Sequence, residues 1–197
     1  MDGAAFRILV PLIFFGFFAH RFYYAGRVRH AAESVARRLP EPVGPLLLLP
    51  LAAVVIAVYA AAPQPLGWAS LPFPEALRWA GLAVAVAAFA LLQWAQAALG
   101  RNWSLRAQRL SSHELVVGGP YHWVRHPMYT AGLLATVSVL LLSANWLVGG
   151  IWLAMHAWQF ALKIPLEEGL MTEQFGDAYR QYARTTGRLI PRILRHG

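Results

Sequence analysis

The chain has 197 residues, of which 58% are hydrophobic and only 13% are charged, and its mean hydropathy is +0.45. Soluble domains carry about 25% charged residues, so this composition excludes an ordinary water-exposed globule and favours a surface that faces lipid. The absence of cysteine excludes disulfides, thiolate nucleophiles and cysteine-ligated metals. The net charge of +8 does not predict a nucleic-acid partner, because the cations lie between apolar runs, where they set membrane topology and meet anionic headgroups.

Three apolar runs reach the length of about 20 residues that a membrane-spanning helix needs. They are Ala4–Tyr24, Val43–Ala62 and Ala76–Leu99. The first run is expected to be a retained span, because it is too long for a signal-peptide core and lacks a convincing cleavage site. The third run is rich in alanine, which predicts close helix packing.

A fourth apolar run, Tyr129–Leu162, is too long for one span. Ser143-Ala144-Asn145 stands at its middle, so we expect a tight hairpin of two shorter helices. Gly149 and Gly150 would allow these helices to pack closely. The predicted total is five spans.

Positively charged residues orient these spans. They lie between the first and second spans, between the third and fourth, and after the fifth. They are Arg21, Arg27, Arg29, Arg37, Arg38, Arg101, Arg106, Arg109, Arg125, Lys163, Arg180, Arg184, Arg188, Arg192 and Arg195. The opposite connections, Pro63–Glu75 and Ser143–Asn145, contain no lysine or arginine. By the positive-inside rule, the N-terminus is predicted to be outside and the C-terminus cytoplasmic.

The last segment, Pro165–Thr186, is predicted to be an amphipathic cytoplasmic helix. Pro165 suits its first turn, and Glu167 and Glu168 suit the positive end of the helix dipole. Gly187 suits its C-terminal stop. The expected fold class is therefore all-α, a polytopic membrane protein with about five transmembrane helices and a cytoplasmic C-terminal helix.

One polar stretch, Asn102–Tyr129, lies on the predicted cytoplasmic side between two spans. Its Gly118-Gly119-Pro120 turn lets the backbone approach a ligand closely, and Pro127 holds His126 out of helical geometry. Its aromatic and histidine side chains suit a cofactor with an adenine ring, ribose hydroxyls and a charged end, although a membrane-interface loop has a similar composition. A metal site is not expected, because the turn and Pro127 keep His122 and His126 off a common helical face.

A longer pattern extends through this stretch and the tail. Its first half is Gly119-Pro120-Tyr121-x-x-Val124-Arg125-His126-Pro127-x-Tyr129. Its second half is Glu167-Glu168 with Leu170, then Phe175-Gly176, Tyr179, Tyr182 and a closing Arg188-x-x-Pro191. This pattern resembles the isoprenylcysteine carboxyl methyltransferase family, which belongs with the phospholipid methyltransferases. The resemblance covers about Asn102–Pro191, and the two halves together are more specific than either alone.

The resemblance implies an integral-membrane methyltransferase that transfers a methyl group from S-adenosylmethionine to a lipophilic acceptor, such as a prenylcysteine-like carboxylate. The length of the chain predicts a single membrane domain, residues 1–197, and its apolar runs predict that residues 1–100 form three spans. Residues 101–197 would then form the cofactor-binding loop, the hairpin and the C-terminal helix. The implied cofactor contacts are Gln108, His113, Glu114, Leu115, Val116, Tyr121, His126, Pro127, Met128, Tyr129 and Glu167.

Lys163 matches a family position that is arginine in the prenylcysteine enzymes, where it faces the substrate carboxylate. Lysine offers a point charge in place of two parallel hydrogen bonds. We expect Glu167 to hold the amino-acid end or the sugar of the cofactor, and Lys163 to position an anionic acceptor, so that both are catalytic residues. Pro165 is expected to interrupt the helix between them, and the two residues could instead be an ordinary i,i+4 ion pair.

Three other functions remain open at this point. The first is a phospholipid N-methyltransferase that acts on an amine headgroup. The second is a small transporter, for which the polar span residues His20, Gln93, Gln96 and His156 provide a weak pathway. The third is a non-catalytic membrane scaffold. The expected location is the bacterial cytoplasmic membrane, with the active site facing the cytoplasm.

Overall fold

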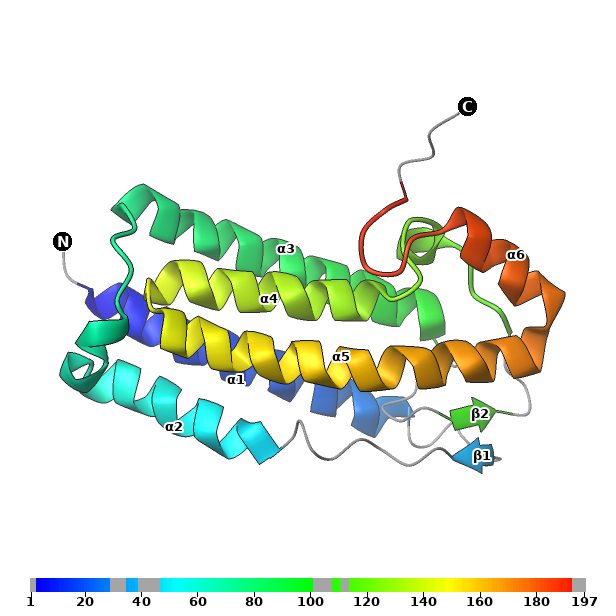
Figure 1. The fold of residues 1–197 in the computed structure, drawn as a ribbon, viewed down its shortest axis with the longest axis horizontal. Coiled ribbons are helices and arrows are strands. Elements are labelled where there is room, and N and C mark those ends of the chain that lie inside the picture. Colours follow the sequence, from blue (N-terminus) through cyan, green and yellow to red (C-terminus); the bar gives the residue numbers. More distant parts are fainter. Residues whose placement is uncertain (1–2, 29–34, 39–46, 101–107, 111–113, 193–197) are drawn as a thin grey trace.

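Five long helices run alternately in opposite directions through the part of the chain that the structure describes (Figure 1). This computed structural model describes residues 3–28, 35–38, 47–100, 108–110 and 114–192. The long helices are α1 (Ala4–Val28), α2 (Leu48–Ala61), α3 (Glu75–Leu99), α4 (Pro127–Ser143) and α5 (Trp146–Phe175). The shorter elements are the 3-10 helices η2 (Gln64–Ala69) and η4 (Gly119–His122) and the helix α6 (Asp177–Thr185).

The predicted turn between α4 and α5 is confirmed. Ala144 adopts a left-handed backbone conformation with φ of 46°. The Asn145 side chain caps α5 by accepting hydrogen bonds from the backbone N–H groups of Leu147 and Val148, both at 3.1 Å. Its amide nitrogen donates to the Leu66 carbonyl oxygen at 2.9 Å, which joins the turn to η2.

Small residues bring neighbouring helices close together, as predicted. A Cβ added at Gly149 would lie 2.7 Å from Leu140 Cβ, whereas one at Gly150 would meet nothing within 4 Å. On α3, a Cβ added at Gly81 would lie 2.9 Å from Leu141 Cβ of α4. The alanine-rich run therefore does pack closely, and its buried face consists of Gly81, Ala85, Ala88, Leu92, Ala95 and Gln96.

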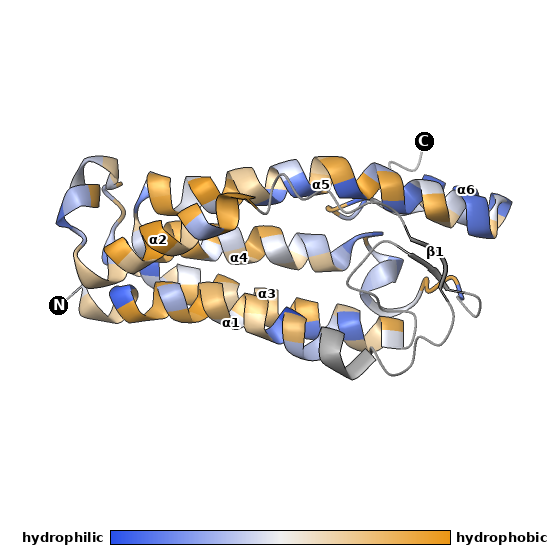
Figure 2. Cartoon of the chain, turned by 90° about the horizontal axis from the view of Figure 1, so that it is seen from below, coloured by the Kyte–Doolittle hydropathy of each residue, from blue (hydrophilic) through white to orange (hydrophobic). Residues whose placement is uncertain are grey.

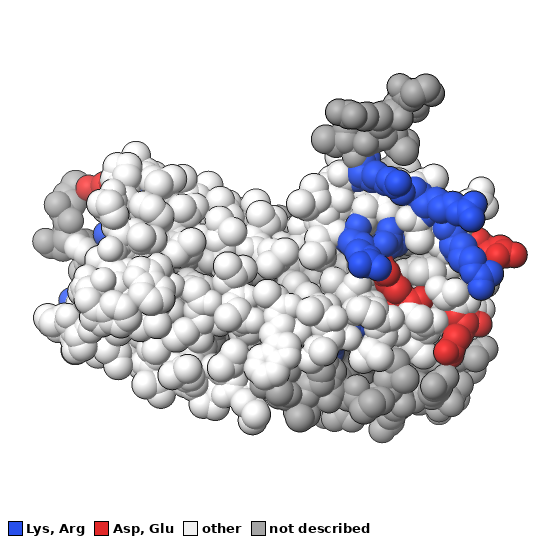
Figure 3. Space-filling view, viewed as in Figure 1, with Lys and Arg blue, Asp and Glu red and all other residues white. Residues whose placement is uncertain are grey.

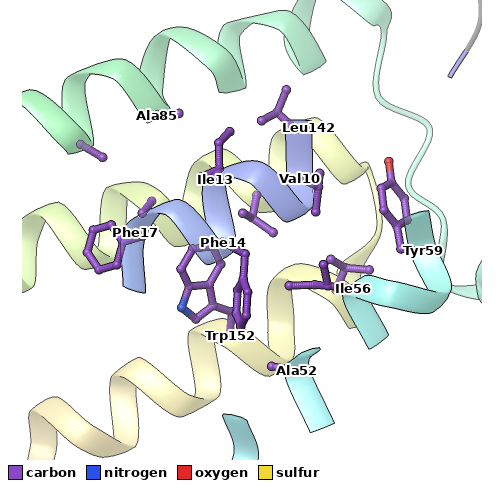
Figure 4. Close-up of a cluster of buried hydrophobic side chains, with 14 of the residues drawn as sticks. Val10, Ile13, Phe14, Phe17, Ala52, Ile56, Tyr59, Ala85, Leu142 and Trp152 are labelled. Atoms are coloured by element: carbon purple, nitrogen blue, oxygen red, sulfur yellow. The ribbon is translucent and has the colours of Figure 1, made fainter. Parts of the chain in front are cut away.

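The main core lies between α1 and the other long helices. Phe14 and Phe17 of α1 contact the fully buried Trp152 of α5, with ring centroids 5.0 and 6.3 Å apart (Figure 4). Ile56 of α2 is buried in the same cluster. Burial of these large side chains against one another holds α1, α2 and α5 in one bundle.

A short pair of strands departs from the all-α prediction. β1 (Val35–Arg38) pairs antiparallel with β2 (Gln108–Leu110), with Val35 opposite Leu110 and Arg38 opposite Gln108. The all-α fold class is therefore confirmed, and this strand pair is a small addition that the sequence did not predict. Backbone N–H and C=O groups outside helices need partners. β1 follows α1 in the chain and β2 follows α3, and the two strands lie at the same end of the bundle, where each supplies partners for the other (Figure 1).

The predicted start of the C-terminal helix is wrong. Pro165 lies inside α5, which continues to Phe175, and the break comes at Gly176, whose φ is 55°. A proline removes one helical hydrogen bond, but glycine alone readily adopts this left-handed conformation, so the chain turns there. The helix between Lys163 and Glu167 is consequently not interrupted. The predicted end of the tail helix is confirmed, because α6 ends at Thr185, Thr186 is its C-cap and Gly187 follows directly.

Two of the described helices are long and apolar enough to cross a membrane. They are the Ala4–Tyr24 part of α1 and the whole of α3. The apolar helices α2 and α4 have only 14 and 17 residues. The predicted second span began at Val43, but α2 begins at Leu48, and residues 39–46 lie outside the described residues. The total of five spans stays a prediction.

Polar residues gather at one end of the bundle. Helix α6 is mainly hydrophilic, whereas α2 is mainly hydrophobic (Figure 2). A wide uncharged area covers the middle of the face shown in Figure 3, and most of the charged side chains visible there lie over α6 and the residues that follow it. This end, which also holds η4 and the start of α4, is called the polar end below.

Candidate active site

The residues after α6 fold back onto the start of α4. Thr186–Ile190, hereafter the C-terminal strap, runs beside the segment before α4, where Val124 and Gly187 form a parallel bridge. The backbone N–H of Arg125 donates to the carbonyl oxygen of Gly187 at 2.8 Å. The N–H of His126 donates to the carbonyl oxygen of Arg188 at 3.0 Å. The polar stretch and the tail are thus in direct contact.

Three of the predicted site residues meet at this junction. The Tyr129 hydroxyl donates a hydrogen bond to Glu167 Oε1, and His126 Nδ1 lies 3.5 Å from Glu167 Oε2. The rings of His126 and Tyr129 are stacked with centroids 5.4 Å apart, and Tyr129 stacks on Phe160 at 4.5 Å. The Glu167 side chain remains 27% exposed, so its carboxylate is held in place but is still accessible.

Glu168, the next residue along α5, has different partners. Arg125 Nη2 donates to its Oε1 at 2.8 Å, and Arg188 Nη2 donates to its Oε2 at 2.8 Å. His126 Nε2 lies 3.4 Å from its Oε1. Arg125 Nη1 also donates to the Ala183 carbonyl oxygen at 2.9 Å. Glu168 therefore connects α5, the segment before α4 and the C-terminal strap.

These contacts shift the pKa values of two of the groups. Burial would raise the pKa of Glu168, but its hydrogen bonds with His126, Arg125 and Arg188 lower it to about 2. Burial lowers the pKa of His126, but hydrogen bonds to Glu167 and Glu168 and their negative charges outweigh this effect and raise it above 6.5. The site therefore favours an ionised Glu168 and a protonated His126.

Tyr121 brings an unsatisfied hydroxyl to the polar end. Its side chain is buried, and its hydroxyl has no hydrogen-bond partner among the described residues. Burial, and then the charge of Glu167, raise the pKa of Tyr121, so the hydroxyl remains a donor. The Tyr182 hydroxyl of α6 donates to the Tyr121 carbonyl oxygen at 2.6 Å, which fixes the backbone of η4.

Lys163 is buried on α5, one helical turn before Glu167, with only 6% of its surface exposed. Its neighbours on α5, Phe160 and Ile164, are also buried and form a small apolar cluster with Tyr129. Lys163 therefore lies beside this apolar cluster, on the part of α5 that also carries Glu167.

The remaining predicted contacts fall on several segments. Pro127 is buried in the first turn of α4, and Met128 packs against the main core. Glu114 is exposed, and Leu115 and Val116 are partly buried, between β2 and η4. Gln108 lies in β2, which is next to α5, and its side chain is outside the described residues, as is the whole of His113.

The sequence analysis did not assign Arg125, Glu168 and Arg188 to the site. All three belong to the family pattern and were quoted as part of it. Their contact could not be deduced, because Arg125 and Glu168 are 43 positions apart in the chain, and a pattern of letters does not show which charges pair. The signal available in the sequence was the pair of adjacent glutamates, Glu167 and Glu168, in a chain of which only 13% of the residues are charged.

Comparison with known proteins finds the family that the sequence pattern resembles. The model of the isoprenylcysteine carboxyl methyltransferase (ICMT) family matches residues 80–173, just under half of the chain. Protein-S-isoprenylcysteine O-methyltransferase B of Arabidopsis thaliana is 32% identical over 95 residues, which cover 47% of this chain and 48% of that protein. Protein-S-isoprenylcysteine O-methyltransferase of Schizosaccharomyces pombe is 31% identical over 97 residues, which cover 48% of this chain and 41% of that protein. The resemblance to the ICMT family is confirmed.

The chain aligns with about half of the length of these curated relatives. The structure of the eukaryotic intramembrane Ras methyltransferase ICMT aligns with a TM-score of 0.58 and 24% identity, covering 79% of this chain and 55% of that one. This likeness shows a shared fold. The segment that matches the ICMT family model extends from α3 through most of α5 and contains His126, Tyr129 and Glu167, whereas α6 and the C-terminal strap lie beyond it.

Proposed function

We propose that the protein is an integral-membrane methyltransferase that uses S-adenosylmethionine to methylate a lipophilic acceptor. The observation that carries this proposal is the meeting of His126, Tyr129 and Glu167 at the polar end of an apolar bundle. All three belong to the pattern that resembles the ICMT family. His126 and Tyr129 stand at the start of α4, and Glu167 lies in α5, the second helix of the hairpin.

The residues present fit the proposed cofactor. Glu167 offers an accessible carboxylate to a cationic ammonium group. The buried Tyr121 hydroxyl is a donor that a polar ligand atom could satisfy. The other proposed cofactor contacts are Gln108, His113, Glu114, Leu115, Val116, His126, Pro127, Met128 and Tyr129. When bound, S-adenosylmethionine supplies a methyl group on a positively charged sulfur.

The protein's own tasks are to bind, orient and exclude water. Tyr129 and His126 fix the Glu167 carboxylate. Lys163, one turn earlier and buried, positions an anionic group of the acceptor. An anionic nucleophile such as a carboxylate needs no general base, so no further titrating residue is required for this acceptor class.

The acceptor is proposed to reach the site from the bilayer. The polar end adjoins a wide uncharged surface, and a lipophilic molecule dissolved in the membrane would meet the site at the edge of that surface (Figure 3). The proposed setting is the cytoplasmic membrane of a bacterium with the site on the cytoplasmic side. The leading acceptor is a prenylcysteine-like carboxylate, and an amine-headed phospholipid is the other outcome that the experiment distinguishes.

The test compares Glu167→Gln with Glu173→Gln, an exposed glutamate on the same helix. We expect Glu167→Gln to weaken binding of S-adenosylhomocysteine by at least about tenfold, the effect of losing one charged hydrogen bond, and Glu173→Gln to leave it unchanged. Calorimetry on the purified protein measures the affinity. Radiolabelled S-adenosylmethionine with a lipid extract then shows whether the label reaches a carboxylate or an amine. Equal affinity in the wild type and Glu167→Gln would contradict the assignment of Glu167.

A further inference from the structure

We propose that the C-terminal strap positions His126, and that the hydrogen bond from Thr130 to the strap holds the strap against α4. The role of His126 in binding rests on the function proposed above. The contacts of the strap do not depend on that function. The strap itself lies beyond the segment that the family model matches, whereas Arg125, His126 and Thr130 lie inside that segment.

The backbone at His126 needs an external partner. His126 stands just before Pro127, the first residue of α4, and its φ of −125° and ψ of 61° are not helical. Its N–H group can therefore make no bond inside the helix. The strap supplies the acceptor, because the carbonyl oxygen of Arg188 accepts from that N–H at 3.0 Å, and Gly187 does the same for Arg125 at 2.8 Å. These two bonds fix the direction in which the His126 ring leaves the backbone.

Thr130 holds the next residue of the strap. Its hydroxyl lies 2.7 Å from the carbonyl oxygen of Leu189 and 3.3 Å from that of His126. The shorter contact joins the first turn of α4 to the strap. The Leu189 side chain in turn packs against the cluster of Tyr129, Phe160 and Ile164. One threonine thus fixes both the backbone of the strap and the apolar contact beside the Glu167 carboxylate.

Two more features hold the C-terminal strap in its position beside α4. Arg188 pairs with Glu168 at 2.8 Å on the outer side. Gly187 sits in a turn so tight that an added Cβ would lie 1.9 Å from the Ile190 carbonyl oxygen. The strap is therefore bound to α4 by its main chain, to α5 by a charge pair and to itself by a turn that only glycine fits.

The test uses Thr130→Val, which keeps the side-chain size and removes the hydroxyl. We expect hydrogen exchange of the Arg125 and His126 amides to accelerate about three- to tenfold, the range for one lost hydrogen bond. Thr130→Ser should restore wild-type exchange. The matched control is Thr136→Val, because the Thr136 hydroxyl donates within α4 to Gly132 at 3.1 Å and does not touch the strap. Exchange unchanged in Thr130→Val, or accelerated equally in Thr136→Val, would overturn the proposal.

Binding of S-adenosylhomocysteine provides the second readout. Thr130→Val should raise its dissociation constant by a similar factor of about three to ten, while Thr130→Ser and Thr136→Val should match the wild type. Faster exchange with unchanged affinity would contradict the role of the strap in the site. If the wild type does not bind this compound, the proposed function fails, and the exchange measurement still decides whether Thr130 and the strap hold His126.

Discussion

Two adjacent glutamates at the polar end have different surroundings. Glu168 is neutralised by the guanidinium groups of Arg125 and Arg188, and its side chain is 14% exposed. Glu167 receives a hydrogen bond from the uncharged Tyr129 hydroxyl and lies next to His126. Both carboxylates share the His126 ring, but Glu168 also pairs with two guanidinium groups. This difference supports the proposed binding role of Glu167 and a structural role for Glu168.

Glu168 gives the protein an acid-sensitive stability. Because folding lowers its pKa from 4.5 to about 2, its ionised form stabilises the fold above pH 4.5, and that stability is lost as the pH falls from 4.5 to 2. One proton changes the free energy of unfolding by at most about 1.4 kcal/mol per pH unit. Thermal unfolding in detergent across this range should show the loss in the wild type and in Glu173→Gln. Glu168→Gln should be less stable at neutral pH and should show a shallower slope, and an identical slope would contradict the charge network.

The contribution of His126 to stability depends on pH in the opposite direction to that of Glu168. Its pKa is raised above 6.5 in the folded protein, so the stability it contributes is fully present below pH 6.5 and is lost as the pH rises through the raised value. Glu167 and Glu168 cause this shift, because the His126 ring contacts both carboxylates. Removing either carboxylate should therefore lower the pKa of His126.

The hairpin shows at the level of elements what a sequence can predict. Asn145 is a strong helix cap that marks the start of α5, and the run of apolar residues is too long for one helix, so the turn could be placed correctly. The prediction from Pro165 was wrong, because proline is typical of the first turn of a helix, whereas α5 continues through Pro165 to Phe175. The strand pair and the partners of Glu168 depend on tertiary contacts between distant segments, which no local pattern contains.

Gly149 is predicted to be essential to the hairpin, and Gly150 is its control. Gly149→Ala would place a Cβ 2.7 Å from Leu140 Cβ and 2.9 Å from its Cα, so α4 and α5 would have to separate. We expect it to lower the free energy of unfolding by about 1–3 kcal/mol, the range for overpacking. Gly150→Ala meets no atom within 4 Å and should raise stability by about 0.5–1 kcal/mol through helix propensity. Thermal unfolding in the same detergent measures both, and equal effects would contradict the close α4–α5 contact.

At the scale of the whole molecule, the cations of the two ends have different environments. Arg7 donates to the carbonyl oxygens of Ala60 and Ala61, at 2.8 and 3.0 Å, at the end of α2. Arg78 donates to the Leu142 carbonyl oxygen at 2.7 Å, near the end of α4, and lies 3.7 Å from the centre of the Phe6 ring. Each therefore serves as a cap for helix carbonyls at the end opposite α6. The arginines of α6 are instead exposed, which leaves the polar end as the positively charged side.

This asymmetry predicts an orientation that can be measured. The chain has no cysteine, so a single cysteine can report on each end. Gln64 in η2 and Gln181 in α6 are both exposed and lie at opposite ends of the bundle (Figure 1). By the positive-inside rule, we expect Gln64→Cys to react with a membrane-impermeant maleimide in intact cells, and Gln181→Cys to react only after permeabilisation.

The reverse pattern would place the proposed site on the outer side, away from a cytoplasmic pool of cofactor, and would contradict the proposed setting. Reaction of both cysteines in intact cells would show that η2 and α6 share one side of the membrane. The lengths of α2 and α4 are relevant to this second outcome. With 14 and 17 residues at about 1.5 Å per residue, these helices reach only about 21 and 25 Å, less than the roughly 30 Å of a hydrocarbon core. Opposite labelling of the two ends would therefore require local thinning of the bilayer, or helix ends that lie within the headgroup region, around these two short helices.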